Sequence, residues 1–150
     1  MLQVVAPVSG TSREVSDVPD PVFASGMVGS GLAIDPGTTT QTAVAPVSGR
    51  LAKLHPHAYL VVTDAGVGVL VHLGIDTVTL RGDGFALLAT EDARVQAGQA
   101  VVRWDPAYVA GTGRSPMCAV VVLDVPDRAV LAHPTGSSVT AGEPVFDVDC

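Results

Sequence analysis

Three of the four histidines lie in one short stretch, residues 55–77, which reads HPHAYLVVTDAGVGVLVHLGIDT. His57 stands near its start and His72 near its end, with apolar runs on both sides of a turn signal at residues 63–66. Runs of this kind around a turn predict a β-hairpin. Two facing imidazoles could do three kinds of chemistry. One ring could take a group as a nucleophile while the other binds it, both could bind zinc, or both could exchange protons near neutral pH.

The length of the hairpin loop decides whether the two rings meet. If Asp64 and Ala65 form a two-residue loop, His57 pairs with His72, and side chains paired in this way lie about 4.5–5.5 Å apart. A loop centred on Ala65 and Gly66 shifts the register by two residues and makes the histidines diagonal neighbours on one face. A three-residue loop puts them on opposite faces of the sheet. The sequence leaves these alternatives open.

Short strands are expected to position the histidines. Gly (16) and Pro (11) recur every few residues, and the Val-rich runs between them are typical of strands. No segment has a long 3.6-residue period, which predicts an all-β fold, an antiparallel β-sandwich or barrel with at most short helical turns. The predicted strands are residues 2–7, 31–34, 43–46, 58–63, 68–73, 100–104, 119–123 and 145–148, and the helical turns are residues 20–24 and 85–90.

Two motifs occur twice. Residues 5–10 read VAPVSG, and residues 44–49 repeat all six letters. The pattern V-x-A-G-x-x-V occurs at residues 95–101 and again at 139–145. In each copy Gly suits a turn and the flanking Val residues suit a core. The repeats predict two similar halves packed together in one domain, residues 1–150.

Composition excludes several classes of protein. The chain is 47% apolar and carries a net charge of −7, whereas nucleic-acid binding needs clustered Lys and Arg. We therefore expect no nucleic-acid partner. The N-terminus does not read as a signal peptide, and the apolar runs are too short to span a bilayer. We expect a cytoplasmic protein without direct membrane insertion, in which Cys118 and Cys150 are free thiols.

The run VHLGIDTVTLRGDGF at residues 71–85 resembles the signature of a known family. That family is the glucose-type enzyme IIA of the bacterial phosphoenolpyruvate:sugar phosphotransferase system, whose pattern is close to V-H-x-G-I-D-T-V-x-L-x-G-x-G-F. Residues 6–10, 17–24, 28–34 and 136–143 resemble further blocks of the same family. The resemblance implies a small antiparallel β-sandwich with internal duplication, in agreement with the repeats.

The resemblance also implies a phosphotransferase component that carries a phosphohistidine. The histidine at the place of His72 accepts a phosphoryl group from phospho-HPr and passes it to the IIB domain of a sugar permease. The histidine at the place of His57 supports the transfer by hydrogen-bonding the phosphoryl oxygens. No permanent cofactor is expected, although zinc could bind between His57 and His72 in complexes with regulatory target proteins.

A site that exchanges a phosphoryl group with other proteins should be shallow and rimmed by apolar residues. The family's blocks place two acidic candidates near the rim, Asp20 and Asp76, which would meet arginines expected on HPr. The apolar candidates for the rim are Val22, Phe23, Met27, Val28 and Val78.

The sequence departs from the family pattern at two positions. His55 stands where the family usually has a threonine bonded to the supporting ring, so that His57 must be held by His55, by backbone or less firmly. Arg81 stands where a lysine is frequent, which keeps the charge.

Two other functions remain open. His55-Pro56-His57 and the segment from His72 to Asp76 contain the H-x-H and H-x-x-x-D elements of zinc endopeptidases, although in reversed order. A regulatory binding module that has lost the transfer is the other alternative. The motifs do not identify the sugar.

Overall fold

The computed structural model describes residues 1–149, so the predicted free thiol of Cys150 lies outside the described residues. The strands are β1 (Leu2–Val5), β2 (Gly10–Glu14), β3 (Ser30–Asp35), β4 (Gln41–Val44), β5 (Gly49–His55), β6 (Ala58–Val62), β7 (Gly68–Leu73), β8 (Phe85–Leu87), β9 (Arg94–Val95), β10 (Ala100–Trp104), β11 (Cys118–Val122), β12 (Val130–Ala132), β13 (Ser138–Val139) and β14 (Pro144–Val148). The helices are α1 (Pro21–Ala24) and α2 (Pro106–Gly111), with 3-10 turns η1 (Val15–Asp17), η2 (Thr77–Leu80) and η3 (Asp127–Ala129).

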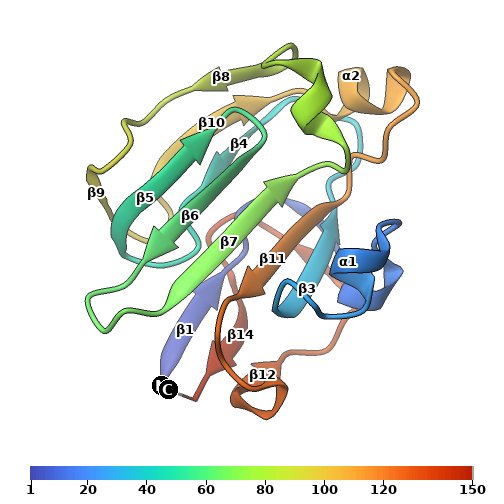
Figure 1. Ribbon diagram of the computed structural model, residues 1–150. Helices are drawn as coiled ribbons and strands as arrows, with labels where there is room; N and C mark the ends of the chain where they lie inside the picture. The colour runs from blue at the N-terminus through green and yellow to red at the C-terminus, as the bar shows by residue number, and fades with distance from the viewer. Residues whose placement is uncertain (150) are drawn as a thin grey trace.

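The strands form one large and two small antiparallel sheets. The large sheet has the order β13-β2-β3-β11-β7-β6-β5-β9, and the small sheets are β1-β14-β12 and β4-β10-β8. Figure 1 shows β5, β6, β7, β11 and β3 side by side, with the strands of the small sheets behind them and α1 beside β3. The main core contains many Val, Leu and Ala residues and three large aromatic side chains, Trp104, Tyr59 and Phe146. The predicted all-β sandwich is confirmed.

The repeated sequences occupy equivalent places. The backbone N–H of Val5 donates to the Pro46 carbonyl at 2.9 Å, and that of Val44 donates to the Pro7 carbonyl at 2.8 Å. Each VAPVSG loop is also hydrogen-bonded to the turn of one V-x-A-G-x-x-V motif. The N–H of Gly142 donates to the Ala6 carbonyl at 2.8 Å, and the N–H of Gly98 donates to the Ala45 carbonyl at 2.9 Å. The large sheet likewise divides into two four-strand halves that meet between β11 and β7. The internal duplication is therefore structural.

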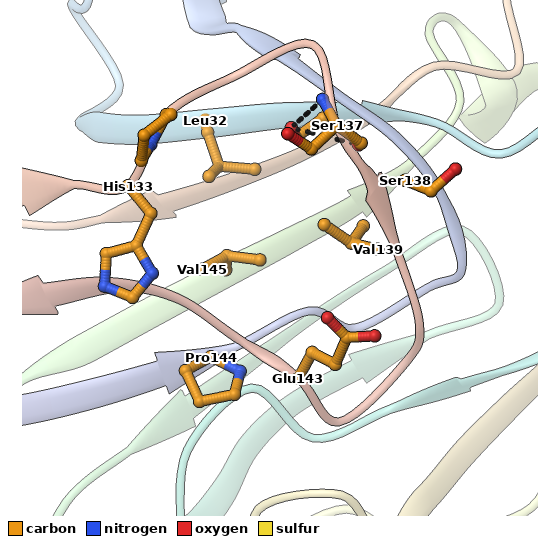
Figure 2. A pocket seen from close by; sticks show the side chains of 10 residues that line it. Leu32, His133, Ser137, Ser138, Val139, Glu143, Pro144 and Val145 are labelled. Carbon is orange, nitrogen blue, oxygen red and sulfur yellow. Dashed lines mark hydrogen bonds between the residues drawn. The ribbon is translucent and has the colours of Figure 1, made fainter.

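A pocket of about 170 Å³ lies in the half that contains β13, β2 and β3. Figure 2 shows Leu32, Val139 and Val145 among the apolar side chains that line it, and His133 and Glu143 among the polar ones. None of the candidate site residues lines this pocket.

The helical elements only partly match the sequence predictions. The turn predicted at residues 20–24 is confirmed as α1, whose first turn is capped by Asp20 through a 2.9 Å hydrogen bond from the Val22 N–H. The helical turn predicted at residues 85–90 is wrong, since Phe85–Leu87 forms β8 and pairs with β10. α2 was not predicted, although Asp105 caps it and Pro106 begins it, a common start signal. In residues 1–149 no helix is long and apolar enough to cross a membrane.

Candidate functional site

The hairpin that carries His72 adopts the three-residue loop, one of the three alternatives that the sequence left open. β6 pairs with β7 so that Ala58 lies opposite His72 and Val62 opposite Gly68. The N–H of Thr63 donates to the Val67 carbonyl, which leaves a three-residue loop at positions 64–66. His57 and His72 are therefore not directly opposed, and neither of the two-residue loops considered from the sequence is formed.

The two imidazoles nevertheless meet, with ring centroids 5.4 Å apart and planes at 68°. His57 precedes β6 and lies with Pro56 in the two-residue turn between β5 and β6, where His55 pairs with Ala58. The alternation of faces that holds within a strand does not apply in such a turn. The prediction that a three-residue loop separates the rings therefore fails, because it treated His57 as a strand residue.

His72 lies on the outer face of the large sheet. Its neighbours in β7, Val71 and Leu73, are fully buried in the main core, so alternation directs the side chain of His72 away from that core. Across the sheet it pairs with Ala58 on one side and Ala119 on the other. Because alanine is small, the imidazole is half-buried in a shallow space between larger groups.

Phe23 closes one side of this space. Its ring contacts the His72 ring edge-on, with centroids 5.3 Å apart and planes at 61°. Phe23 is 8% exposed and belongs to a small apolar cluster with Ala119 and Ile75 on the outer face of the sheet. α1 thus supports the flank of His72. The sequence indicated Phe23 as a rim candidate but not its contact with the His72 ring.

A backbone carbonyl determines which nitrogen of His72 is free. Nδ1 lies 2.5 Å from the carbonyl oxygen of Gly74. Because a carbonyl only accepts, we assign the ring proton to Nδ1, which leaves the lone pair of the neutral ring on Nε2. Gly74 has φ 76°, a left-handed conformation that favours glycine and lets its carbonyl turn back toward the ring.

Both rings are neutral at neutral pH. Burial lowers the pKa of the His72 imidazole, against the opposing effects of the Gly74 carbonyl and of the Asp20 and Asp76 carboxylates. Burial and then the neighbouring His72 and His55 charges lower the pKa of the His57 imidazole from 6.5 to about 4. A neutral imidazole has the lone pair that nucleophilic attack requires.

The turn η2 follows His72 and is held by a residue that the sequence did not indicate. Asp76 and Arg81, at the two ends of η2, have φ values of 59° and 53°, which non-glycine residues rarely adopt. The Arg114 guanidinium donates to the Asp76 carbonyl at 3.1 Å and to the Thr79 hydroxyl at 2.7 Å. Since Arg114 lies far along the chain from Asp76, no local motif could have revealed this contact.

The expected rim residues differ in how far they are exposed. Val22, Met27 and Val78 are exposed by 49%, 80% and 59%. Val28 is half-buried and Phe23 is buried. Of the two acidic candidates, Asp76 is exposed, whereas Asp20 is half-buried and its carboxylate caps α1.

A comparison with known families identifies the chain. Residues 2–127 match the model of the family described as phosphoenolpyruvate-dependent sugar phosphotransferase system, EIIA 1. The chain belongs to this family. It is 37% identical over 142 residues to the glucose-specific EIIA component of Halalkalibacterium halodurans. The aligned residues cover 93% of this chain and 81% of that protein.

Two further relatives show the same EIIA unit in different settings. The N-acetylglucosamine-specific EIICBA component of Escherichia coli K12 is 35% identical over 149 residues, which are 97% of this chain but 23% of that longer protein. The solved structure of glucose permease IIA from Mycoplasma capricolum superposes with a TM-score of 0.88 at 35% identity and covers 97% of this chain and 94% of its own.

As an EIIA component, the protein is a phosphocarrier of the sugar phosphotransferase system. The general function of the family is phosphoryl transfer from HPr to the IIB domain of a sugar permease. The predicted family, fold and function are confirmed.

The described part of the chain offers no metal-binding cluster in support of the zinc-hydrolase alternative. Among residues 1–149, no group of three or more His, Cys, Asp or Glu side chains converges so as to hold a metal ion. A zinc ion shared with a partner's carboxylate, as the resemblance implies for regulatory complexes, stays a prediction.

Proposed function

We propose that Nε2 of His72 is the atom of this EIIA that carries the phosphoryl group, and that the His57 ring binds the phosphoryl oxygens during transfer. The observation that carries this proposal is the hydrogen bond between Nδ1 of His72 and the Gly74 carbonyl. It leaves Nε2 as the nucleophilic nitrogen. The nearby His57 ring is neutral, so that one of its nitrogens is an N–H that can donate to a phosphoryl oxygen.

In the accepting step, the lone pair of Nε2 forms a bond to phosphorus. The bond between phosphorus and HPr breaks, and HPr keeps the electron pair of that bond. The His72 ring then carries a positive charge in the imidazole, and its Nδ1 proton remains bonded to the Gly74 carbonyl, which stabilises that charge. The onward step to IIB reverses these roles, with Nε2 as the leaving atom.

We further infer that Val22, Met27 and Val78 contact both protein partners, and that Asp76 and Asp20 meet cationic groups on HPr. The three apolar side chains are well exposed. Val22 lies in α1 next to Phe23, which contacts His72, and Val78 lies in η2, which follows His72. Exposed apolar residues rimmed by charges are typical of transient protein interfaces.

The test is the intact mass of the protein after incubation with phosphoenolpyruvate, enzyme I and HPr. Wild type should gain one acid-labile phosphoryl group, and His72→Ala should gain none. His57→Ala should still be phosphorylated but should pass the group slowly to IIB. His133→Ala is the control, since His133 pairs with Asp147 and does not contact the site. A phosphorylated His72→Ala would refute the assignment.

The sugar is a separate proposal. Because relatives include glucose-specific and N-acetylglucosamine-specific components, we propose that the acceptor is a cytoplasmic IIB domain for one of these two sugars. Phosphoryl transfer to purified IIB domains of both kinds, compared at equal concentrations, would distinguish them. Regulatory target proteins would be sought with the phosphorylated and unphosphorylated forms.

A further inference from the structure

We propose that His55 is a positioning residue for phosphoryl transfer, whose imidazole stacks on His57 and holds that ring facing His72. This inference rests on the proposed function of His57 and His72. The His55 and His57 ring centroids lie 5.7 Å apart, with planes only 24° from parallel. On its other side the His57 ring meets His72 edge-on. The His57 ring thus has an imidazole on each side.

The sheet register builds this arrangement. His55 pairs with Ala58, and Ala58 pairs with His72, so the three residues form one row across β5, β6 and β7. Side chains paired across strands share a face, and two strand spacings separate His55 from His72 by about 10 Å. That gap is wide enough for one imidazole, and the His57 ring from the adjoining turn occupies it.

An irregularity in β5 puts His55 on this face. The register of β5 against β6 shifts between Leu51 and Lys53. Leu51 is fully buried in the main core, and regular alternation would direct residue 55 to the same side. Because the extra residue shifts the alternation, Leu54 packs against the core and His55 is exposed on the outer face.

Within the described residues, no hydrogen bond fixes the orientation of the His57 ring. The backbone carbonyl of His57 accepts from the Leu73 N–H at 2.7 Å, which anchors the turn to β7. None of the hydrogen bonds found within residues 1–149 involves a ring nitrogen of His57. Its nitrogens are therefore free for a phosphoryl group, and ring stacking is left to orient the imidazole.

The experiment compares His55→Ala, which removes the ring, with His55→Phe, which keeps a flat ring without nitrogens. The first readout is the rate of phosphoryl transfer to IIB. We expect His55→Ala to slow it roughly tenfold or more, as small misplacements of reacting groups do, and His55→Phe to restore most of the loss. His133→Ala is the control for loss of an imidazole away from the site.

The second readout is the NMR chemical shift of the His57 ring protons, assigned with His57→Ala. A stacked aromatic ring shifts these protons, so the shift should collapse in His55→Ala and persist in His55→Phe. This readout reports the stacking whether or not transfer occurs, and unfolding midpoints would show that each variant is folded.

Two results would overturn the inference. One is a His55→Ala variant that transfers at the wild-type rate, and the other is a His55→Phe variant as slow as His55→Ala with its stacking intact. His72→Ala in the same series separates this failure from failure of the proposed function. If His72→Ala still takes a phosphoryl group, the His72 assignment is wrong. If His72→Ala takes none but His55→Ala transfers at the wild-type rate, only the present inference about His55 is wrong.

Discussion

At the scale of single residues, the chemistry depends on where two protons are. The Gly74 carbonyl holds a proton on Nδ1 of His72, and burial keeps the His57 imidazole neutral. A histidine in solution exchanges between two tautomers and a cation near neutral pH. In this protein one backbone oxygen and partial burial select one form of the nucleophile, and within residues 1–149 no carboxylate hydrogen-bonds its ring.

Gly74→Ala should disturb that selection. A Cβ at Gly74 would lie 2.6 Å from Cγ2 of Thr77 and 3.1 Å from the Ser115 carbonyl, and the residue has φ 76°. Either the Thr77 side chain or the Gly74 backbone must shift. We expect the backbone and its carbonyl to move, which gives slower phosphorylation by HPr and a loss of about 1–3 kcal/mol in unfolding free energy.

Gly66→Ala is the matched control. Gly66 also has a left-handed φ, 87°, but an added Cβ would meet nothing within 4 Å. It should lose about 1–2 kcal/mol from backbone strain alone and phosphorylate normally. Equal phosphorylation rates in the two variants would contradict the role of the Gly74 carbonyl.

The lowered pKa of His57 predicts a pH dependence of stability. The unfolded chain takes up a proton on this ring as the pH falls through about 6.5, whereas the folded protein does so only near 4. The unfolded state therefore binds more protons between these values, and stability falls with falling pH in that window. In urea titrations at several pH values, His57→Gln should lose less stability than wild type between pH 6.5 and pH 4. Parallel curves would contradict the lowered pKa.

At the scale of elements, the site depends on small residues beside a large one. The row through β6, β7, β11 and β3 reads Ala58, His72, Ala119 and Ala33. Three alanines give the sheet a shallow outer surface over which Phe23 and the neighbouring histidine can approach His72. A row of larger residues would push these rings away.

Ala119→Leu tests this argument. Ala119 is fully buried beside His72 and in the cluster with Phe23, so the larger side chain should displace one of the two rings. We expect slower phosphorylation and a loss of about 1–3 kcal/mol in unfolding free energy. Ala86→Leu, on exposed β8 of another sheet, makes the same change away from the site and should phosphorylate normally. Normal phosphorylation of a folded Ala119→Leu would show that the alanine row is not required.

The elements also show what the sequence could predict. Val-rich strands such as β7 and β11 were found because both their faces are apolar or their alternation is clear. β2 and β5 were missed because exposed charged residues interrupt the pattern, as in GTSRE and GRLAKLH. Local patterns carry no information on which strand an isolated polar segment will join.

The candidate site was predictable where it depends on the signature and not where it depends on distant contacts. The signature and the hairpin pattern indicated His57 and His72, although the sequence left the register of the hairpin open. Two contacts join segments that are far apart in the chain: the edge contact of Phe23 with His72, and the hydrogen bonds from Arg114 to η2. The stacking of His55 on His57 depends on the bulge in β5. Side-chain direction at such places follows from the assembled fold.

At the scale of the whole molecule, two similar halves carry one site. When the repeated VAPVSG loops are aligned, the strand pairings that follow them align β3 with β6 and β11 with β7. Gly31 then corresponds to Ala58, and Val121, which pairs with Gly31, corresponds to His72, which pairs with Ala58. Val121 is buried in the same apolar cluster as Phe23. One half therefore supplies the nucleophile, and the equivalent position of the other half helps to support it.

The same alignment accounts for the pocket in Figure 2. Leu32 corresponds to Tyr59, whose hydroxyl donates to the Val44 carbonyl at 2.7 Å and whose ring fills the core of its half. A leucine is smaller, so the half that contains Leu32 keeps a hollow beside it. The pocket thus follows from an asymmetry between the repeats.

If the duplication stabilises the fold, equivalent residues of the two halves should contribute in the same way. The hydroxyl oxygen of Ser9 accepts from the Ala141 N–H, and that of Ser48 accepts from the Ala97 N–H, both at 2.9 Å. Ser9→Ala and Ser48→Ala should each lower the unfolding free energy by about 1 kcal/mol. Ser9→Ala should cost more because Ser9 is half-buried whereas Ser48 is exposed, and water replaces a lost bond more easily at an exposed position. Urea unfolding of both single variants and the double variant would measure this, with phosphorylation of His72 unchanged throughout. A loss confined to one half would mean that the repeated loops no longer have equivalent structural roles.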